Sequence, residues 1–163
     1  METPQIRPAR PDEAPAITEL ALRSKGHWGY PPEFLEACRE ELTVTPARCA
    51  AGSVVVAVDG DRVLGYHDVE GSPPDGELAA LFVAPDVIGT GLGAILLRHA
   101  LEQSVRRGLR RLVLDADPGA EGFYARFGAV RVGEAPSGSI PGRVLPRMVF
   151  DLTGRDAAEQ LLQ

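Results

Sequence analysis

The sequence predicts an α+β fold in three layers: a mixed, mostly antiparallel central sheet with helices on both faces. Three observations predict it. Two segments near the N-terminus have apolar residues at helical spacing, and runs of β-branched residues separated by polar turns follow them. A strand, a long helix and another strand then follow within about thirty residues, which is the length of a crossover that makes two strands parallel. The 163 residues match one ordinary domain, so a single domain is expected over 1–163.

The first half of the chain predicts one strand, two helices and a hairpin. Prolines start both helices, because a proline lacks the N–H group that the first helical turn leaves unpaired. β-branched residues on either side of a polar turn are typical of a hairpin. The expected elements are a strand over 5–10, a helix from Pro11, a helix from Pro31 that Thr45 and Pro46 end, and strands over 53–58 and 62–69.

The second half of the chain predicts the crossover and the rest of the sheet. The central helix carries a broad apolar face, and glycines stand before it and after it. The expected elements are a turn over 71–76, a strand over 77–84, a helix over 89–107, a strand over 112–114, a helix over 120–127, a strand near Val130, a loop over 135–143, a strand over 145–152 and a terminal helix over 153–163.

Composition narrows the class of protein. The chain is 44% hydrophobic and 25% charged, which is typical of a globular protein, and no apolar run approaches the roughly 18 residues of a membrane-spanning helix. The first residues also lack the apolar stretch of a secretory signal, so we expect a cytoplasmic protein without a membrane partner. Cys38 and Cys49 are expected to be reduced, structural thiols.

The net charge of −6 disfavours a nucleic-acid partner. A local basic cluster is the exception, and it flanks the end of the predicted central helix at Gly108. Cations at a helix C-terminus offset the negative pole of the helix dipole, which explains the cluster without a ligand. Its members are Arg106, Arg107, Arg110 and Arg111.

The segment LFVAPDVIGTGLGAILL, residues 81–97, places Gly89, Gly91 and Gly93 between an apolar strand and a helix. The first N–H groups of a helix are unpaired and the dipole's positive pole lies there, so this arrangement predicts an anion site that suits a phosphate. Side chains at the glycine positions would hold phosphate oxygens beyond hydrogen-bonding distance. A tight turn with close helix packing is the alternative.

Two other phosphate ligands are less consistent with this loop. A nucleoside triphosphate loop requires a lysine, whereas Ala94 and Ile95 follow the glycines. A dinucleotide site fits better, since Gly89, Gly91 and Ala94 match G-x-G-x-x-A and Asp115 ends the next strand. A Rossmann-type domain begins with that motif, however, while here an antiparallel region precedes it.

With FYARFGAV at 123–130, the glycine loop IGTGLG at 88–93 makes the sequence resemble the GNAT superfamily of N-acetyltransferases over nearly the whole chain. Ile88 departs from the family, which usually has Arg or Gln there. The resemblance implies that acetyl-CoA lies where the parallel fourth and fifth strands splay, beside the edge of the fourth. The cofactor-binding residues it implies are Leu81, Phe82, Val83, Ile88, Gly89, Thr90, Gly91, Leu92, Gly93, Ala94 and Asp117.

The resemblance also implies direct transfer of an acetyl group to a primary amine. Tyr124 falls on the family's tyrosine position and would protonate the departing thiolate, because a phenol is a weaker acid than a thiol. Glu77 would remove the proton of the ammonium group, directly or through water. The alternatives are a packing role for Tyr124, solvation alone for Glu77 and helix capping for Asp117.

The acceptor side is less defined. His27, Trp28 and Tyr30 lie between the first two helices, where they either grip the amine acceptor or pack on the core. His67 is a weaker candidate base, and His99 is expected to be structural. No metal is assigned, and a homodimer is compatible with the resemblance. A non-catalytic acetyl-CoA-binding relative and a Rossmann-type oxidoreductase remain as alternatives.

Overall fold

A computed structural model describes residues 3–137 and 140–153. Within them the chain gathers into two compact units. The first unit takes its residues from Met1–Asp68 and Ala80–Leu97, and the second from Val69–Ala79 and Arg98–Gln163.

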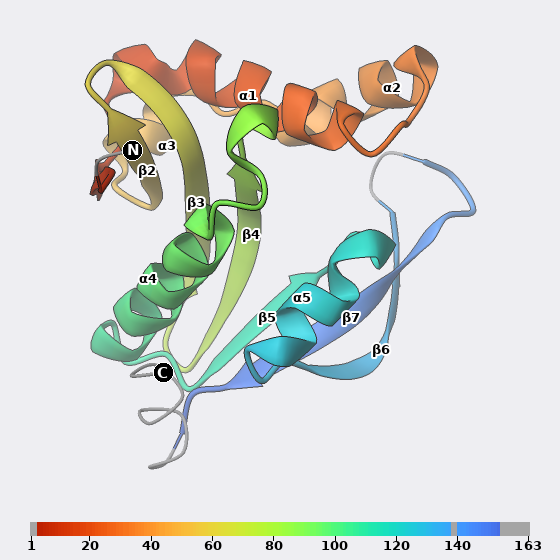
Figure 1. Ribbon diagram of the computed structural model, residues 1–163. Helices are drawn as coiled ribbons and strands as arrows, with labels where there is room; N and C mark the ends of the chain where they lie inside the picture. The colour runs from red at the N-terminus through yellow and green to blue at the C-terminus, as the bar shows by residue number, and fades with distance from the viewer. Residues whose placement is uncertain (1–2, 138–139, 154–163) are drawn as a thin grey trace. The chain divides into compact units, whose positions relative to one another are not determined.

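The first unit holds the N-terminal helices and the first strands (Figure 1). Three elements are divided between the units: β3 and α4 begin in the first unit, and β4 begins in the second. The elements are β1 (Gln5–Pro8), η1 (Pro11–Glu13), α1 (Ala14–Gly26), α2 (Pro32–Leu42), α3 (Pro46–Ala50), β2 (Val54–Asp59), β3 (Arg62–Ser72) up to residue 68, β4 (Asp75–Val83) from residue 80, η2 (Pro85–Val87) and α4 (Leu92–Arg106) up to residue 97.

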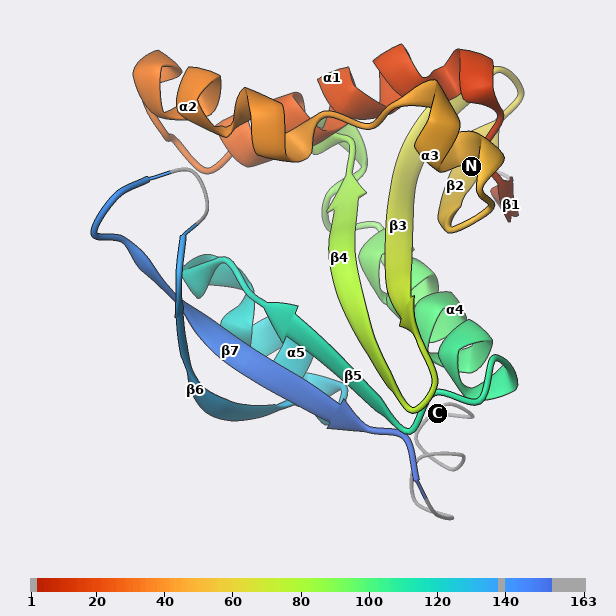
Figure 2. The same cartoon turned by 180° about the vertical axis from the view of Figure 1, so that it is seen from behind.

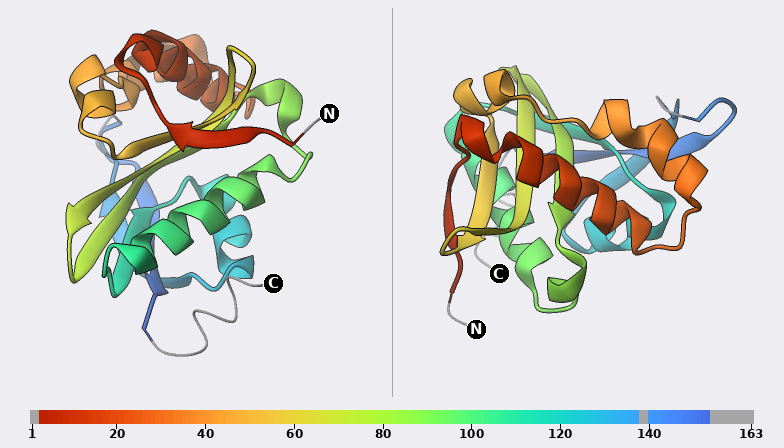
Figure 3. Two further views of the ribbon diagram at one scale, coloured as in Figure 1. Left: turned by 90° about the vertical axis from the view of Figure 1, so that its left-hand side faces the viewer. Right: turned by 90° about the horizontal axis from the view of Figure 1, so that it is seen from above.

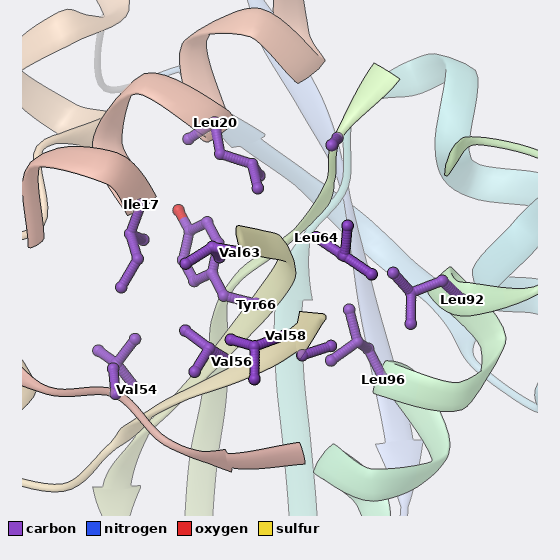
Figure 4. Packing of buried hydrophobic residues seen from close by; sticks show 14 of the residues in the cluster. Ile17, Leu20, Val54, Val56, Val58, Val63, Leu64, Tyr66, Leu92 and Leu96 are labelled. Atoms are coloured by element: carbon purple, nitrogen blue, oxygen red, sulfur yellow. The ribbon is translucent and has the colours of Figure 1, made fainter. Parts of the chain in front are cut away.

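β2 is buried on both faces, which explains its unbroken run of apolar residues. Every residue over 54–58 is buried, as expected for a strand that is covered on both sides. α1 and the first turns of α4 lie on opposite faces of β2 and β3 (Figure 3). Ile17 of α1 lies near the Tyr66 ring, and Leu92 and Leu96 of α4 lie near Leu64 (Figure 4).

The predicted hairpin is confirmed, and its turn requires a glycine. β2 and β3 pair antiparallel with Asp59 opposite Arg62, and Gly60 has a φ of +60° in the turn between them. A second glycine allows a close approach rather than a turn. A Cβ atom on Gly65 would lie 2.8 Å from Cδ1 of Leu96, so the bare backbone of β3 lets α4 pack against it.

The second unit builds the other half of the sheet (Figure 2). β4 pairs in parallel with β5, and β7 pairs antiparallel with both β5 and β6. α5 lies against one face of β5 and β7. Besides the remaining parts of β3, β4 and α4, the elements are β5 (Arg111–Asp115), η3 (Pro118–Ala120), α5 (Glu121–Arg126), β6 (Val130–Pro136) and β7 (Val144–Asp151).

Arg107, one member of the basic cluster, has a structural role in this unit. α4 ends at Arg106, and Gly108 continues the chain with a φ of +84°. Arg107 then donates hydrogen bonds to the carbonyl oxygens of Val69, at 3.1 Å, and Gly71, at 2.9 Å. The Arg107 guanidinium therefore satisfies two backbone carbonyl groups near the end of β3.

In the described residues the strands form one seven-stranded sheet in the order β1-β2-β3-β4-β5-β7-β6. The parallel pair is β4 and β5, and the mixed, mostly antiparallel α+β fold is confirmed. The ladder between these two strands is short, because it joins only Asp75–Glu77 of β4 to 111–113 of β5.

Three of the expected elements differ from the structure or lie outside its described residues. Thr45 and Pro46 are predicted only to end a helix, but they also begin α3. The Thr45 hydroxyl accepts the Arg48 N–H at 3.2 Å and caps this new helix. α4 begins at Leu92 rather than at residue 89. The predicted helix over 153–163 lies outside the described residues except for Thr153.

No helix within the described ranges is both long enough and apolar enough to cross a bilayer.

Candidate active site

The glycine loop of the first unit presents bare backbone on an open side. Gly89 has a φ of +88° and Gly91 a φ of +91°, conformations that residues with a side chain rarely adopt. A Cβ atom on either glycine would meet nothing within 4 Å. Gly93, in contrast, lies inside the first turn of α4 and has no positive φ. The first two glycines are therefore needed for the shape of the loop, and the space before them suits a ligand.

Five backbone donors gather in this loop. The N–H groups of Gly89, Gly91 and the first three residues of α4 donate no hydrogen bond to any residue that the structure describes. The next donor, the Ile95 N–H, already bonds to the Gly91 carbonyl at 3.1 Å. Unpaired donors at the positive end of a fifteen-residue helix make an anion-binding array.

The side chains of the loop stabilise its conformation and add no free donor for a ligand. The Thr90 hydroxyl donates to the Val87 carbonyl at 2.6 Å, and the Thr90 N–H donates to the same oxygen at 3.2 Å. Its hydroxyl proton is thus committed to the turn. The side chains of Leu92, which is buried, and Ile88, which is half-buried, are apolar. They therefore offer no hydrogen-bond donor to an anion.

The predicted cofactor edge leads directly into this loop. Leu81, Phe82 and Val83 are half-buried at the end of β4, beyond the part of the strand that pairs with β5. The Ala84 N–H donates to the Leu64 carbonyl of β3 at 2.8 Å, and η2 then turns the chain toward the glycines. The first unit therefore brings together the predicted strand edge and the predicted phosphate loop.

A charged pair beside the loop was not predicted. Arg62 of β3 binds Asp86 of η2, 24 positions away in the sequence. One signal was available, since Asp86 is the single ionisable residue between Ala84 and Leu97. Its partner is brought to it only by the fold.

Tyr124 lies in α5 of the second unit and is 8% exposed. Its ring meets the Phe123 ring edge to face at 5.2 Å, and its hydroxyl makes no hydrogen bond with the described residues. Burial, reinforced by the negative charge of Asp117, raises the pKa of the phenol well above its usual range. The group therefore stays protonated, which a proton donor requires.

Asp117 and Glu77 differ in how the second unit holds them. Asp117 accepts the Gly119 N–H at 3.0 Å, which confirms the predicted cap, and lies 3.5 Å from Arg143. Glu77 is exposed on β4, directly opposite Val113 of β5. The hydrogen bond from Arg147 to Asp115 is the main cause that raises the pKa of Arg147, and the charge of Glu77 adds to it.

The aromatic loop between α1 and α2 divides into two parts. Tyr30 stacks on Phe34 with ring centroids 4.3 Å apart, so it packs against α2. His27 and Trp28 contact each other edge to face at 5.4 Å, and Trp28 is 61% exposed. Contact of this loop with the acceptor stays a prediction. His27 and Trp28 are the two of its predicted residues that are exposed to solvent.

The remaining histidines lie on β3 and α4 and are wholly or partly buried. His67 is fully buried on β3 opposite Val55. His99 is half-buried on α4, and burial, together with the charge of Arg106, lowers its pKa. Partial burial fits the structural role expected for His99, and the weaker candidacy of His67 as a base stays a prediction.

Buried phenols predict that the protein loses stability in alkali. Burial raises the pKa of both Tyr66 and Tyr124 above the value near 10 of an exposed phenol. Their contribution to stability is complete below pH 10 and is lost as the pH rises toward their folded-state pKa values. The unfolding free energy should fall by about 1.4 kcal/mol per pH unit for each phenol.

Denaturant unfolding at pH 9, 10 and 11 measures that slope. Above pH 10 the slope of the Tyr66→Phe variant should be smaller than that of the wild type by about 1.4 kcal/mol per pH unit. Equal slopes for the variant and the wild type would contradict the prediction.

A parallel strand pair joined by a donor-lined glycine loop and a long helix defines a class of protein that holds a phosphorylated cofactor at a helix N-terminus. The antiparallel strands before the loop separate this class from Rossmann-type domains.

Comparison with known proteins identifies the family. The profile of the Acetyltransferase (GNAT) family matches residues 15–129, so this chain belongs to the GNAT acetyltransferases. The Rossmann-type alternative is thereby wrong, and the predicted family is confirmed.

Several relatives are similar to this chain. Peptidyl-lysine N-acetyltransferase YjaB of Salmonella typhimurium is 36% identical over 74 residues, which are 45% of this chain and 47% of that protein. The match thus spans less than half of that relative. A GCN5-related N-acetyltransferase from Rhodopseudomonas palustris superposes with a TM-score of 0.75 at 26% identity, over 93% of this chain and 98% of that one.

A third likeness concerns the fold alone. PaiA N-acetyltransferase from Thermoplasma acidophilum, solved in complex with coenzyme A, gives a TM-score of 0.77 at 16% identity and covers 92% of this chain and 99% of its own.

Proposed function

We propose that this protein is an acetyl-CoA-dependent N-acetyltransferase that moves the acetyl group to a primary amine by direct attack. The observation that carries the proposal is the array of five unbonded N–H groups over Gly89 to Ala94. Family membership supports acetyl transfer, and the array supports a diphosphate ligand.

The loop fits the diphosphate of coenzyme A. Gly89 and Gly91 keep their N–H groups accessible, and the space at their Cβ positions is open to 4 Å. Backbone donors supply most of the binding at such a site, so the apolar side chain of Ile88 weakens the site without abolishing it. The half-buried edge over Leu81, Phe82 and Val83 would run alongside the pantetheine arm.

The bound cofactor supplies an activated acetyl thioester. Tyr124, kept protonated by burial, donates its proton to the departing sulfur. Glu77 accepts a proton from the ammonium form of the acceptor, so that a neutral amine is present. Asp117 holds the turn before α5 through its bond to Gly119 and so helps to place Tyr124.

The acceptor side involves His27 and Trp28, which are exposed between α1 and α2. An aromatic face attracts a cation, and the net charge of −6 favours cationic acceptors over anionic ones. A peptidyl lysine is one acceptor of this kind, as the name of the YjaB relative indicates for that protein. Small amines have the same chemistry and belong in the same screen.

Calorimetric titration with acetyl-CoA tests the cofactor, and NAD serves as the control ligand. We expect binding of acetyl-CoA and none of NAD. A free-thiol assay across lysine peptides and small amines then tests turnover. Failure to bind coenzyme A at millimolar concentration would overturn the proposal, whereas binding without turnover on any amine would favour a non-catalytic relative.

Glu77→Gln should change how kcat/KM depends on pH on the acidic side of the profile. If the Glu77 carboxylate accepts the proton, activity falls at low pH because the carboxylate becomes protonated, and the amide variant should lose that limb together with about 100-fold of kcat/KM. The measurement is kcat/KM from pH 5 to 9. Glu102→Gln, which changes an exposed carboxylate on α4, is the control and should keep the wild-type profile.

A further inference from the structure

Arg62 and Asp86 form an ion pair at the entrance to the glycine loop. Nη2 of Arg62 donates to both carboxylate oxygens of Asp86, at 2.5 Å and 2.7 Å. Arg62 begins β3, and Asp86 is the middle residue of η2, the turn that joins β4 to the loop. Both side chains are about half exposed, at 50% and 59%.

η2 connects this pair to the backbone donors. The Val87 N–H donates to the Ala84 carbonyl at 3.0 Å, and the Val87 carbonyl in turn accepts both hydrogen bonds of Thr90. Asp86 therefore lies within the turn that orients Thr90 and, on either side of it, Gly89 and Gly91. Any negative charge on Asp86 that is not neutralised lies three positions before Gly89, the first residue of the donor array.

That charge is the wrong sign for the ligand. Asp86 is the single ionisable residue over 84–97, and Ile88 adds no positive charge to balance it. The hydrogen bond from Arg62 is the main cause that lowers the pKa of Asp86, so the carboxylate is ionised at neutral pH. A bare carboxylate there would repel a diphosphate, because like charges oppose binding.

We propose that Arg62 is a positioning residue for coenzyme A: its guanidinium neutralises Asp86 and so keeps the approach to the glycine loop favourable for a diphosphate. The proposal rests on the proposed function of that loop. Arg23 of α1, whose charge also acts on Asp86, makes a smaller contribution of the same sign.

A double-mutant cycle with coenzyme A as the probe tests this role. Arg62→Gln should weaken binding about fivefold at low salt, the upper range for an exposed ion pair, and Asp86→Asn should leave the Kd within about twofold of wild type. The double variant should recover most of the affinity, because the repelling carboxylate is gone. In about 1 M NaCl the Arg62→Gln loss should shrink, since charges are screened beyond about 3 Å.

A purely mechanical role predicts the opposite pattern. If the pair only tethered η2, Asp86→Asn would weaken binding as much as Arg62→Gln, and the double variant would not recover. Either result, or wild-type affinity in Arg62→Gln, would overturn the proposal. Arg62→Lys keeps the charge and should keep the affinity.

Matched controls separate this inference from the fold and from the proposed function. Arg39 has a similar exposure, 47%, and pairs with Glu19 and Glu36 at 3.3 Å in the same unit, so Arg39→Gln should leave the Kd unchanged. Thermal unfolding by circular dichroism reports whether each variant is folded. A wild type that fails to bind coenzyme A refutes the function of the loop, whereas normal binding by Arg62→Gln refutes only the role of Arg62.

Discussion

Gly91→Val should raise the Kd for coenzyme A by about 100-fold or more. Gly91 has a φ of +91°, which a β-branched residue adopts only with strain. If the backbone keeps this conformation, the new side chain occupies the open space that the ligand needs. If the backbone relaxes to a negative φ, the N–H groups turn away from the array. Losing two bonds to a charged ligand, each about 1.5 kcal/mol, accounts for the expected change.

Gly52→Val is the control, because this glycine has the same φ of +91° and the same lack of atoms within 4 Å of its Cβ position. It lies between α3 and β2, in the same unit as the loop. Both variants should lose a similar unfolding free energy, about 1–3 kcal/mol, since the backbone strain is alike. Only Gly91→Val should lose calorimetric binding of coenzyme A. Wild-type affinity in Gly91→Val would show that the loop does not hold the diphosphate.

The sequence predicts those parts of the fold that depend on short-range rules. The β2–β3 hairpin follows from β-branched runs around Gly60, and the parallel pair follows from the length of the crossover through α4. The glycine loop is also local, because its conformation is set by Gly89 and Gly91 themselves. For the same reason the helix could not begin at residue 89: a left-handed φ is incompatible with a right-handed helix.

The features that the sequence did not predict have long-range causes in one case and ambiguous local signals in two others. Arg62 and Asp86 are 24 positions apart and meet only because β3 begins where β4 ends. Tyr30 was expected either to bind an acceptor or to pack, and its partner Phe34 became known only from the geometry of the turn into α2. Similarly, Thr45 and Pro46 carry signals both for ending one helix and for starting the next, and local rules do not choose between them.

The role of Tyr124 leads to the second large effect. Tyr124→Phe should lower kcat about 100-fold or more while the Kd for coenzyme A stays within about threefold, because the hydroxyl acts only on the departing thiolate. A packing role predicts a different result. The phenylalanine ring keeps the edge-to-face contact with Phe123, so a residue that only packs would lose little activity and little stability.

Tyr66→Phe is the matched control for this substitution. Tyr66 is also a buried phenol with a raised pKa, and its hydroxyl has no hydrogen bond within the described residues. The two variants remove the same atom from a similar environment, so a difference in kcat reports chemistry rather than packing. Steady-state rates at saturating acetyl-CoA measure it. Equal kcat values for Tyr124→Phe and the wild type would remove the phenol from the reaction and leave the departing thiolate to take its proton from water.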